Sequence, residues 1–277
     1  MKLHPTVLDK VSKLAQSIEP QKIKVKKVVV IKAKPRTFFI PNQYAKTKQK
    51  HLYKLLQDIQ LPKYIFSKKG SSFVDKAKYH LGDGYLINTD IKSFYPSVHY
   101  KRIENIFMDL GVNNFQKLTY LTTCDKYLPL GFVTSPFLGN LVLSDADQRL
   151  NKLCEQQNIK YSRYVDDLTF SSQKVIDKNF FQKVKKILKS NGFTLNEQKT
   201  KTFTPSDRKV VLGLKLLDNS VDITEEYLTK VKDDIETLKL FKKYKIDSGE
   251  LNAKLKGELS FIKSVNEETY QLLKSIE

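Results

Sequence analysis

The stretch Tyr161-Ser162-Arg163-Tyr164-Val165-Asp166-Asp167-Leu168-Thr169-Phe170-Ser171 decides the fold of this 277-residue chain. Its aromatic and β-branched residues are typical of strands, whereas aspartate is rare in strands and neighbouring carboxylates repel each other. A solvated hairpin turn would tolerate the pair Asp166 and Asp167. A bound divalent cation would make the pair favourable, because it supplies the missing positive charge. The sequence therefore predicts two apolar strands joined by a turn that carries two carboxylates.

A third carboxylate ends an earlier apolar strand. The turn dipeptide Asp83-Gly84 precedes a predicted strand over residues 85–90, which ends at Asp90. The next residues are Ile91-Lys92-Ser93-Phe94-Tyr95-Pro96-Ser97. An Asp-Asp pair alone is a weak signal. An earlier strand-end aspartate followed by paired aromatics makes the combination specific.

The charge of the chain points to a polyanionic partner. The formal net charge is +19, and residues 1–50 hold 13 Lys and Arg against 2 Asp and Glu, whereas residues 222–277 hold 10 against 12. Nucleic acid is the commonest reason to tolerate such self-repulsion. Because 44 of the 49 basic residues are lysine, contacts to phosphates are favoured over reading of bases. A solvated lysine-rich tail is the alternative for the first 20 residues.

Several classes of protein are disfavoured by composition. The aromatic and apolar content excludes global disorder, and no apolar run is long enough for a membrane span. The two cysteines form neither a disulfide framework nor a zinc pattern. Since the N-terminus lacks the apolar region of a signal peptide, we expect a cytoplasmic protein without a membrane partner.

The motifs resemble those of reverse transcriptases, in the order that this family has them. Tyr164-Val165-Asp166-Asp167 resembles the catalytic box, and residues 89–97 resemble the first catalytic motif of the palm. The motif that binds template and nucleotide is resembled by residues 128–136 with Asn140. The next motif of the family is resembled by residues 191–200, and the primer grip by residues 211–214. Ala77-Lys78-Tyr79-His80 and residues 256–265 are similar to segments specific to bacterial retron reverse transcriptases. The resemblance covers residues 34–277.

The resemblance implies an α+β right-hand polymerase with three parts. The fingers, with a basic N-terminal extension, would be residues 1–85, the palm with its antiparallel sheet and part of the fingers 86–218, and the helical thumb 219–277. Local patterns agree with this: residues 24–40 are rich in strand formers, and residues 44–59 have helical spacing. A thumb helix is predicted from the three- and four-residue spacing of Leu228, Val231, Ile235, Leu238 and Phe241. The chain ends soon afterwards, so we expect no appended endonuclease, RNase H or maturase domain.

The implied reaction is nucleotidyl transfer, in which a 3′-hydroxyl attacks an α-phosphorus and pyrophosphate leaves. Two Mg²⁺ ions would be held by Asp90, Asp166, Asp167 and the backbone carbonyl of Ile91. Lys199 is placed like the family's lysine that protonates pyrophosphate. A surface lysine is its ordinary alternative, and a solvated acidic cluster is the alternative for the aspartates.

Further residues are candidates for binding substrate and primer. Tyr95 resembles the aromatic residue that excludes the ribose 2′-hydroxyl, with a core aromatic as the alternative. Other residues carry roles by the same resemblance: Lys34 and Arg36 for the triphosphate, Gly131, Ser135 and Pro136 for nucleotide and template, Leu212, Gly213 and Leu214 for the primer, and His80 for orienting RNA or a neighbouring loop. An ordinary loop or hairpin is the alternative for the glycines, and a structural histidine is the alternative for His80.

The retron resemblance implies deoxynucleotide substrates and a cognate structured noncoding RNA as template and primer. Priming from an RNA 2′-hydroxyl would give a branched RNA–DNA hybrid, in antiphage defence with an effector protein. Three departures from the family pattern are Lys76, Leu130 and Leu212, which stand in place of Asn, Gln and Thr. Lys76 and Leu212 motivate one alternative, another bacterial defence-associated reverse transcriptase with different priming or product, whereas Leu130 bears on contacts to template and nucleotide. A second alternative is a scaffold that holds RNA, DNA and an effector without turnover.

Overall fold

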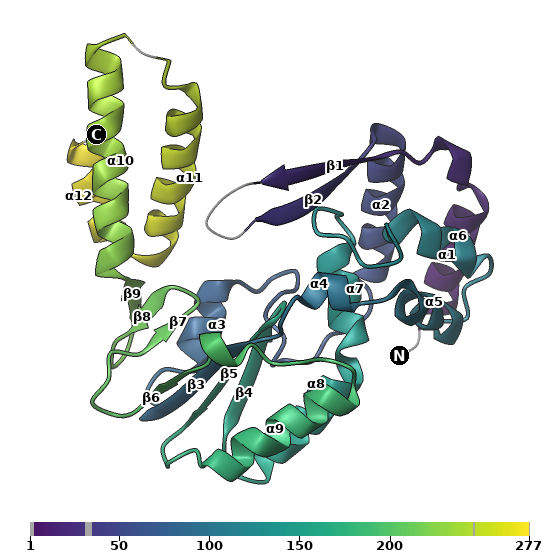
Figure 1. The fold of residues 1–277 in the computed structure, drawn as a ribbon, viewed down its shortest axis with the longest axis horizontal. Helices are drawn as coiled ribbons and strands as arrows, with labels where there is room; N and C mark the ends of the chain where they lie inside the picture. Colours follow the sequence, from purple (N-terminus) through teal and green to yellow (C-terminus); the bar gives the residue numbers. More distant parts are fainter. Residues whose placement is uncertain (1–2, 31–34, 246, 277) are drawn as a thin grey trace. The chain divides into compact units, whose positions relative to one another are not determined.

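The computed structural model describes residues 3–30, 35–245 and 247–276 and divides the chain into two compact units. The first unit comprises Met1–Ser72, Ile87–Phe170 and Ile176–Lys201. The second comprises Phe73–Leu86, Ser171–Val175 and Thr202–Glu277. Figure 1 shows the elements of both units along the chain. The chain passes from one unit to the other several times, so neither unit is a continuous segment of sequence.

The first unit begins with a helix, a hairpin and a second helix. Helix α1 (Pro5–Gln16) precedes strand β1 (Val25–Val30), which pairs antiparallel with β2 (Arg36–Pro41), and α2 (Gln43–Leu56) follows. In this hairpin Val30 lies opposite Arg36. The strand prediction for residues 24–40 is confirmed over 25–30 and 36–40, and the helix prediction for 44–59 is confirmed, although the helix ends at Leu56. Lys34 lies outside the described residues.

A four-stranded sheet carries the acidic motifs. Its strand order is β4-β5-β3-β6, with bounds β3 (Tyr85–Asp90), β4 (Lys160–Tyr164), β5 (Asp167–Ser172) and β6 (Lys201–Phe203). Only Val165 and Asp166 separate β4 from β5, which makes this pair the predicted hairpin. All residues of β5 after Asp167 are buried, as expected for a central strand covered on both faces.

Further helices of the first unit share one hydrophobic core with strands β3, β4 and β5. Their bounds are α4 (Phe94–Ser97), α5 (Tyr100–Asp109), α6 (Phe115–Thr122), α7 (Ser135–Val142), α8 (Ser144–Glu155) and α9 (Lys178–Ser190). Helices α8 and α9 lie side by side, and α8 packs on β4 (Figure 1). Fully buried leucine or phenylalanine side chains each stabilise the fold by about 1.5–3 kcal/mol. Examples from different elements are Phe107, Leu138, Leu150, Phe170 and Leu188.

The second unit is a small sheet packed with helices. Strands β7 (Val210–Val211), β8 (Leu214–Leu216) and β9 (Val221–Ile223) pair antiparallel in that order. Its helices are α3 (Phe73–Tyr79), α10 (Glu225–Lys243), α11 (Gly249–Val265) and α12 (Glu267–Ile276). Val231, Ile235 and Leu238 of α10 are buried in its core, which confirms the amphipathic helix predicted from their spacing.

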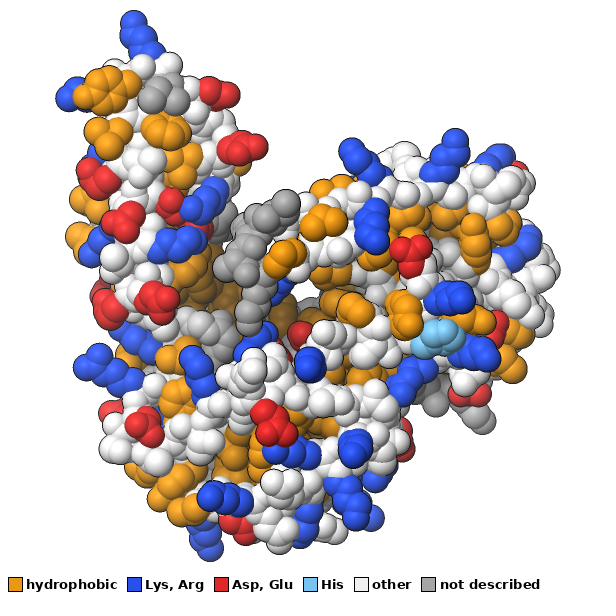
Figure 2. Space-filling model, in the orientation of Figure 1, with side chains coloured by type: hydrophobic (Ala, Val, Ile, Leu, Met, Phe, Trp, Pro, Cys, Tyr) orange, Lys and Arg blue, Asp and Glu red, His pale blue; other side chains and the backbone are white. Residues whose placement is uncertain are grey.

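The exposed faces of this helical part mix both signs of charge. Figure 2 shows acidic and basic side chains interspersed over α10 and α11. One example is Lys239, which pairs with Glu236 at 2.9 Å. Among the described residues, no helix is both long and apolar enough to cross a lipid bilayer.

Candidate active site

A backbone hydrogen bond joins the two strand ends that carry the aspartates. The N–H of Ile91, directly after Asp90 at the end of β3, donates to the carbonyl oxygen of Asp166 at 2.9 Å. β3 and β5 are neighbours in the sheet, so the end of one lies beside the start of the other. The charges of Asp90 and Asp167 both act on the carboxylate of Asp166. The three predicted aspartates therefore come together.

The turn between β4 and β5 has an unusual backbone. Val165, the first of its two residues, has φ +57°, in the left-handed region. A β-branched residue rarely adopts this conformation, which costs on the order of 1–3 kcal/mol and persists only where its surroundings fix it. The two-residue turn places Asp166 at the tip of the hairpin and Asp167 at the first position of β5.

The electrostatics of the cluster favour a bound cation. The pKa of Asp166 is raised, first by burial and then by the charges of Asp90 and Asp167. The Oδ1 atom of Asp90 is buried and has no hydrogen-bond partner in the described part of the chain. A buried carboxylate oxygen without a donor is costly unless another positive group reaches it.

A lysine from a later segment reaches the same carboxylate. Oδ2 of Asp90 forms an ion pair with Nζ of Lys199. The segment before Lys199 runs along the end of β3: the N–H of Asn196 donates to the carbonyl of Asp90 at 2.8 Å, and the hydroxyls of Thr89 and Thr200 lie 2.8 Å apart. These contacts place the 3₁₀ turn Glu197–Lys199 beside the aspartates.

The donor set fits a hard divalent cation. Carboxylate oxygens are the ligands that Mg²⁺ prefers, and the unpartnered Oδ1 of Asp90 together with the repelled Asp166 supplies such oxygens. Within the described ranges, no three His, Cys, Asp or Glu side chains already converge in a ligating arrangement. The ion pair between Lys199 and Asp90 is consistent with this, because the ammonium takes up one of the oxygens that a cation would use.

Of the two aromatic residues after Asp90, Phe94 belongs to the hydrophobic core and Tyr95 lies near the aspartates. Phe94 is 2% exposed and packs against Phe193, with ring centroids 5.8 Å apart. Tyr95 is half-buried, and its pKa is raised to about 12, first by burial and then by the charge of Asp166. Because that charge acts on the phenol, Tyr95 lies beside the aspartates, as its predicted role requires.

The segment 128–136 packs closely on β2. Gly131 has φ +111°, and a Cβ at this position would meet the carbonyl oxygen of Phe39 at 2.6 Å, so only glycine fits. The N–H of Phe39 donates to the carbonyl of Leu130 at 2.8 Å. The backbone that approaches Gly131 is therefore that of Phe39, on the strand that begins with the exposed Arg36.

The other two residues predicted in this segment differ in their surroundings. Ser135 is buried, and its hydroxyl donates to the carbonyl of Pro129 at 2.6 Å. This contact fixes the start of α7. Pro136 is exposed in the first turn of that helix. Of these two, only Pro136 presents its side chain to solvent.

The remaining predicted residues lie in the second unit. His80 is fully buried, and its Nδ1 lies 2.6 Å from the hydroxyl of Ser171, which donates to Asp83 at 2.6 Å. Such a side chain has no direct access to RNA, so of its two predicted roles the orientation of a neighbouring loop is favoured. Lys76, one of the three departures from the family pattern, is also fully buried.

Leu212 and Gly213 form the two-residue turn between β7 and β8. Both have positive φ, +49° and +81°, as in the type I′ turns that suit hairpins. Leu214 is fully buried in the core of the second unit, opposite Ile223. A contact to a primer would therefore come from the turn and not from the side chain of Leu214.

A buried group beside the site was not among the sequence predictions. Arg163, one of five arginines, is 1% exposed and forms an ion pair with Asp147 at 2.6 Å. An arginine inside an apolar strand, two residues before the turn, is the signal that could have identified it, since buried charges must be paired.

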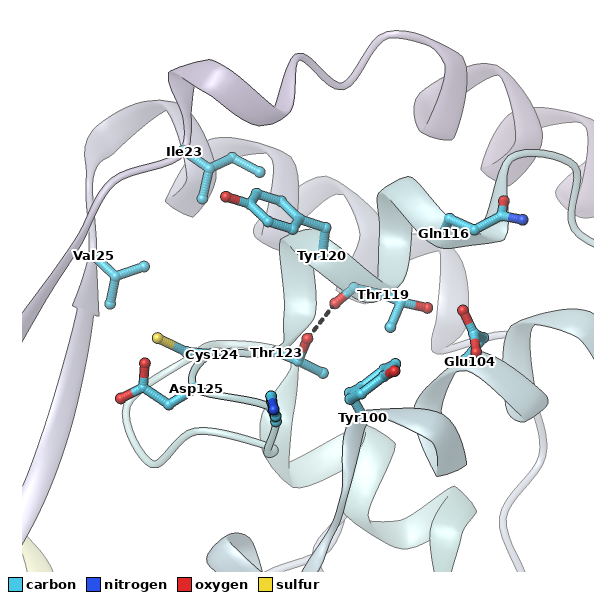
Figure 3. A pocket seen from close by; sticks show the side chains of 11 residues that line it. Ile23, Val25, Tyr100, Glu104, Gln116, Thr119, Tyr120, Thr123, Cys124 and Asp125 are labelled. Atoms are coloured by element: carbon cyan, nitrogen blue, oxygen red, sulfur yellow. Dashed lines mark hydrogen bonds between the residues drawn. The ribbon is translucent and has the colours of Figure 1, made fainter.

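A pocket of about 500 Å³ opens elsewhere in the first unit (Figure 3). Tyr100 and Tyr120 project toward it, and Cys124 and Asp125 form part of its edge. The lining contains none of the residues predicted for catalysis or substrate binding. The aspartates thus define the candidate site independently of this pocket.

Comparison with protein families identifies one match over most of the chain. A model described as reverse transcriptase (RNA-dependent DNA polymerase) matches residues 11–216. The retron Ec86 reverse transcriptase of Escherichia coli is 29% identical, over 86% of this chain and 74% of that protein. The retron Ec48 reverse transcriptase of the same organism is 26% identical, over 61% and 43%. The retron Mx162 reverse transcriptase of Myxococcus xanthus is 26% identical, over 52% and 36%.

Two solved structures share the fold. Apo telomerase from Candida tropicalis, truncated from its C-terminal domain, has a TM-score of 0.52 at 15% identity and covers 78% of this chain and 59% of its own. Telomerase from Candida albicans, in complex with a fragment of telomeric RNA, has a TM-score of 0.50 at 12% identity and covers 96% and 60%. The α+β right-hand polymerase fold predicted from the sequence is confirmed.

Proposed function

Because the chain belongs to the reverse transcriptase (RNA-dependent DNA polymerase) family and is of the retron type, we propose that it copies part of a cognate structured noncoding RNA into DNA. One observation carries the proposal. The end of β3 and the β4–β5 turn bring Asp90, Asp166 and Asp167 together, and an oxygen of Asp90 is buried without a partner.

The family uses divalent metal ions, and the proposal specifies two Mg²⁺ ions at these oxygens. Asp90, Asp166, Asp167 and the carbonyl of Ile91 would hold them. Bound there, the ions would activate the attacking 3′-hydroxyl and neutralise charge on the leaving pyrophosphate. The low-dielectric surroundings of Asp166 strengthen its attraction for a cation.

In the proposed reaction the ammonium of Lys199 would move from the carboxylate of Asp90 to the leaving pyrophosphate. Its side chain is half exposed, so it can leave the carboxylate of Asp90 and reach a departing pyrophosphate. There its ammonium would donate a proton to the leaving oxygen. Its contact with Asp90 supports this role, since it places the ammonium at the reacting centre before substrate arrives.

Substrate and primer binding are proposed for further residues of the chain. Tyr95 would lie beneath the sugar and exclude a 2′-hydroxyl. Arg36, with Lys34, would hold the triphosphate, since a guanidinium binds phosphate oxygens with two donors. Gly131, Ser135 and Pro136 would shape the nucleotide and template side, and the turn at Leu212 and Gly213 would support the primer.

The three-part division is likewise proposed. The fingers would be residues 1–85, the palm 86–218 and the thumb 219–277. We further propose, from the retron resemblance of the motifs, a branched RNA–DNA product primed from an RNA 2′-hydroxyl, a role in antiphage defence with an effector protein, and action in the cytoplasm. The chain spans 74% of the Ec86 relative and 43% of the Ec48 relative, so partners of those whole proteins enter here as proposals.

The deciding experiment is sequencing of nucleic acid that co-purifies with the chain when it is expressed with its neighbouring RNA-coding region. We expect a DNA of constant sequence joined to RNA through a 2′,5′ linkage. An Asp166→Asn variant should co-purify with no such DNA. The control is Asp145→Asn, which changes an exposed aspartate of α8 and should yield the same DNA as the unaltered protein.

Other products would favour the alternatives. Free cDNA or a homopolymer would indicate another defence-associated reverse transcriptase, as the departures at Lys76 and Leu212 suggest. Biological activity that survives Asp166→Asn, with unchanged product, would indicate a scaffold and contradict the proposed polymerase.

A further inference from the structure

A buried polar network lies directly behind the β4–β5 turn. Arg163 on β4, Asp147 on α8 and Asn140 on α7 are each at most 2% exposed. The guanidinium holds Asp147 with two parallel hydrogen bonds, Nε to Oδ1 at 2.8 Å and Nη2 to Oδ2 at 2.6 Å. Tyr161 also donates to Oδ1 at 2.7 Å. The buried carboxylate is thus paired, which fixes the plane of the guanidinium.

The other side of the same guanidinium faces the turn. Its Nη1 donates to the carbonyl oxygen of Val165 at 2.7 Å and to Oδ1 of Asn140 at 2.9 Å. The N–H of Val165 donates to the hydroxyl of Ser67 at 3.0 Å. That hydroxyl donates to Oδ1 of Asn140 at 3.0 Å, and Nδ2 of Asn140 donates to the carbonyl of Ser67 at 2.9 Å. Both backbone polar groups of Val165 are therefore held by one connected network.

The position of Ser67 follows from a short extension of the sheet. The N–H of Arg163 donates to the carbonyl of Tyr64, and the N–H of Phe66 donates to the carbonyl of Arg163, each at 2.9 Å. Ile65 thereby forms a parallel bridge to Arg163. Since the chain runs alongside β4 here, Ser67 arrives level with Val165, two residues further along each segment.

Val165 requires such support because of its backbone. At φ +57° a β-branched residue is strained, and a strained turn relaxes unless contacts on both sides prevent it. Relaxation of Val165 would rotate the following peptide and redirect the carboxylates of Asp166 and Asp167.

We propose that Ser67, Asn140 and Arg163 are positioning residues that hold Val165 in the left-handed conformation and so aim the carboxylates of Asp166 and Asp167. The inference rests on the proposed function, in which those carboxylates hold the catalytic metal ions. Lysine could not replace Arg163, because a single ammonium lacks the planar fork that serves Asp147, Asn140 and Val165 at once. Asp147 acts by keeping this fork in place.

The test begins with Ser67→Ala, which removes the acceptor of the Val165 N–H and the hydroxyl that donates to Oδ1 of Asn140. Ser67→Thr keeps the hydroxyl and is the conservative variant. Thr122→Val is the matched control, because it removes a buried hydroxyl that donates to the carbonyl of Leu118 in α6. The readouts are melting temperature, kcat and KM for deoxynucleotides, and binding of Mn²⁺ alone by electron paramagnetic resonance.

We expect Ser67→Ala to remain folded, to bind Mn²⁺ about tenfold more weakly and to lose about tenfold in kcat with little change in KM. Ser67→Thr should recover most of both losses, and Thr122→Val should change neither. Arg163→Lys should show the same pattern more strongly where it folds. Unchanged Mn²⁺ affinity and kcat in folded Ser67→Ala would overturn the proposal.

The Mn²⁺ measurement separates this inference from the proposed function. If the unaltered protein extends no primer, the polymerase assignment fails, whereas weaker Mn²⁺ binding by Ser67→Ala than by Ser67→Thr still supports the aiming of the carboxylates. Equal binding by the two variants would reject the aiming role, even where the polymerase assignment stands.

Discussion

The N–H of Ile91 donates to the carbonyl oxygen of Asp166 at 2.9 Å, so one peptide hydrogen bond ties the strand that ends in Asp90 to the turn that carries the other two aspartates. This bond sets three like charges near one another, and Lys199 pairs with that of Asp90. In the absence of a cation the arrangement is electrostatically unfavourable.

Asp166→Asn should stabilise the metal-free protein while removing activity. The pKa of Asp166 is raised in the folded state, so its contribution to stability is present below the unfolded pKa and is lost as pH rises through the folded pKa. At pH 7 the ionised carboxylate is therefore destabilising, and a neutral amide is not. Calorimetry without metal should show a higher Tm for the variant.

Addition of Mg²⁺ should make the unaltered protein more stable than Asp166→Asn. The unaltered protein should gain Tm because the ion binds only the folded state, and Asp166→Asn should gain less. Primer extension by the variant should fall by about 10³-fold or more, since it lacks a ligand of the reacting centre. A variant that is less stable without metal at pH 7 would contradict this account of the cluster.

Tyr95→Ala should reduce discrimination against ribonucleotides. Removal of the ring opens space for a 2′-hydroxyl, so the ratio of kcat/KM for deoxynucleotide over ribonucleotide should fall by about tenfold or more. Tyr95→Phe is the control, because it keeps the ring and removes only the phenol oxygen. Single-nucleotide incorporation assays give the ratios, and equal discrimination by the alanine variant would refute the role.

Replacement of two glycines of the second unit by alanine should change the free energy of unfolding in opposite directions. A Cβ at either Gly213 or Gly257 would have open space, with nothing within 4 Å. Gly213 has φ +81°, so Gly213→Ala should lower the free energy of unfolding by about 1 kcal/mol. Gly257 lies inside α11, where Gly257→Ala should raise it by about 0.5–1 kcal/mol. Urea unfolding measures both, and effects of the same sign would show that backbone conformation is not the cause.

RNA binding should weaken steeply with salt. The net charge of +19 arises mostly from lysine, and neutralised phosphates release counterions, so log K should fall linearly with log salt concentration. Filter binding at about 50 mM and about 200 mM salt should show that the affinity for RNA falls by about tenfold or more. Salt-insensitive binding would remove the electrostatic part of the proposal.

Much of the fold was predictable from short patterns. The hairpin around Asp166, the strand that ends at Asp90 and the amphipathic helix α10 each follow from local residue order, because strand and helix periodicities act over a few residues. The grouping of the aspartates was predictable as well, since their motif order resembles that of a known family. These features need no knowledge of how distant segments pack.

Other features depend on contacts between residues far apart in the chain. His80 is fully buried, and its Nδ1 contacts the hydroxyl of Ser171, 91 residues later. The close approach to Gly131 comes from Phe39, on a strand that is distant in the sequence. No local pattern encodes such neighbours, because packing partners are selected by the assembled core.

The sequence by itself determined which carboxylates are proposed for the chemistry and the strand ends and turn on which they lie, because a polar residue at an apolar strand end is a local signal. Only the tertiary structure decided how they are aimed. Val165 is held by Ser67, 98 positions earlier, and Asp90 is met by Lys199, 109 positions later. A strained turn and a cluster of like charges are both unfavourable alone, so they exist only where distant parts of the chain supply the compensating contacts.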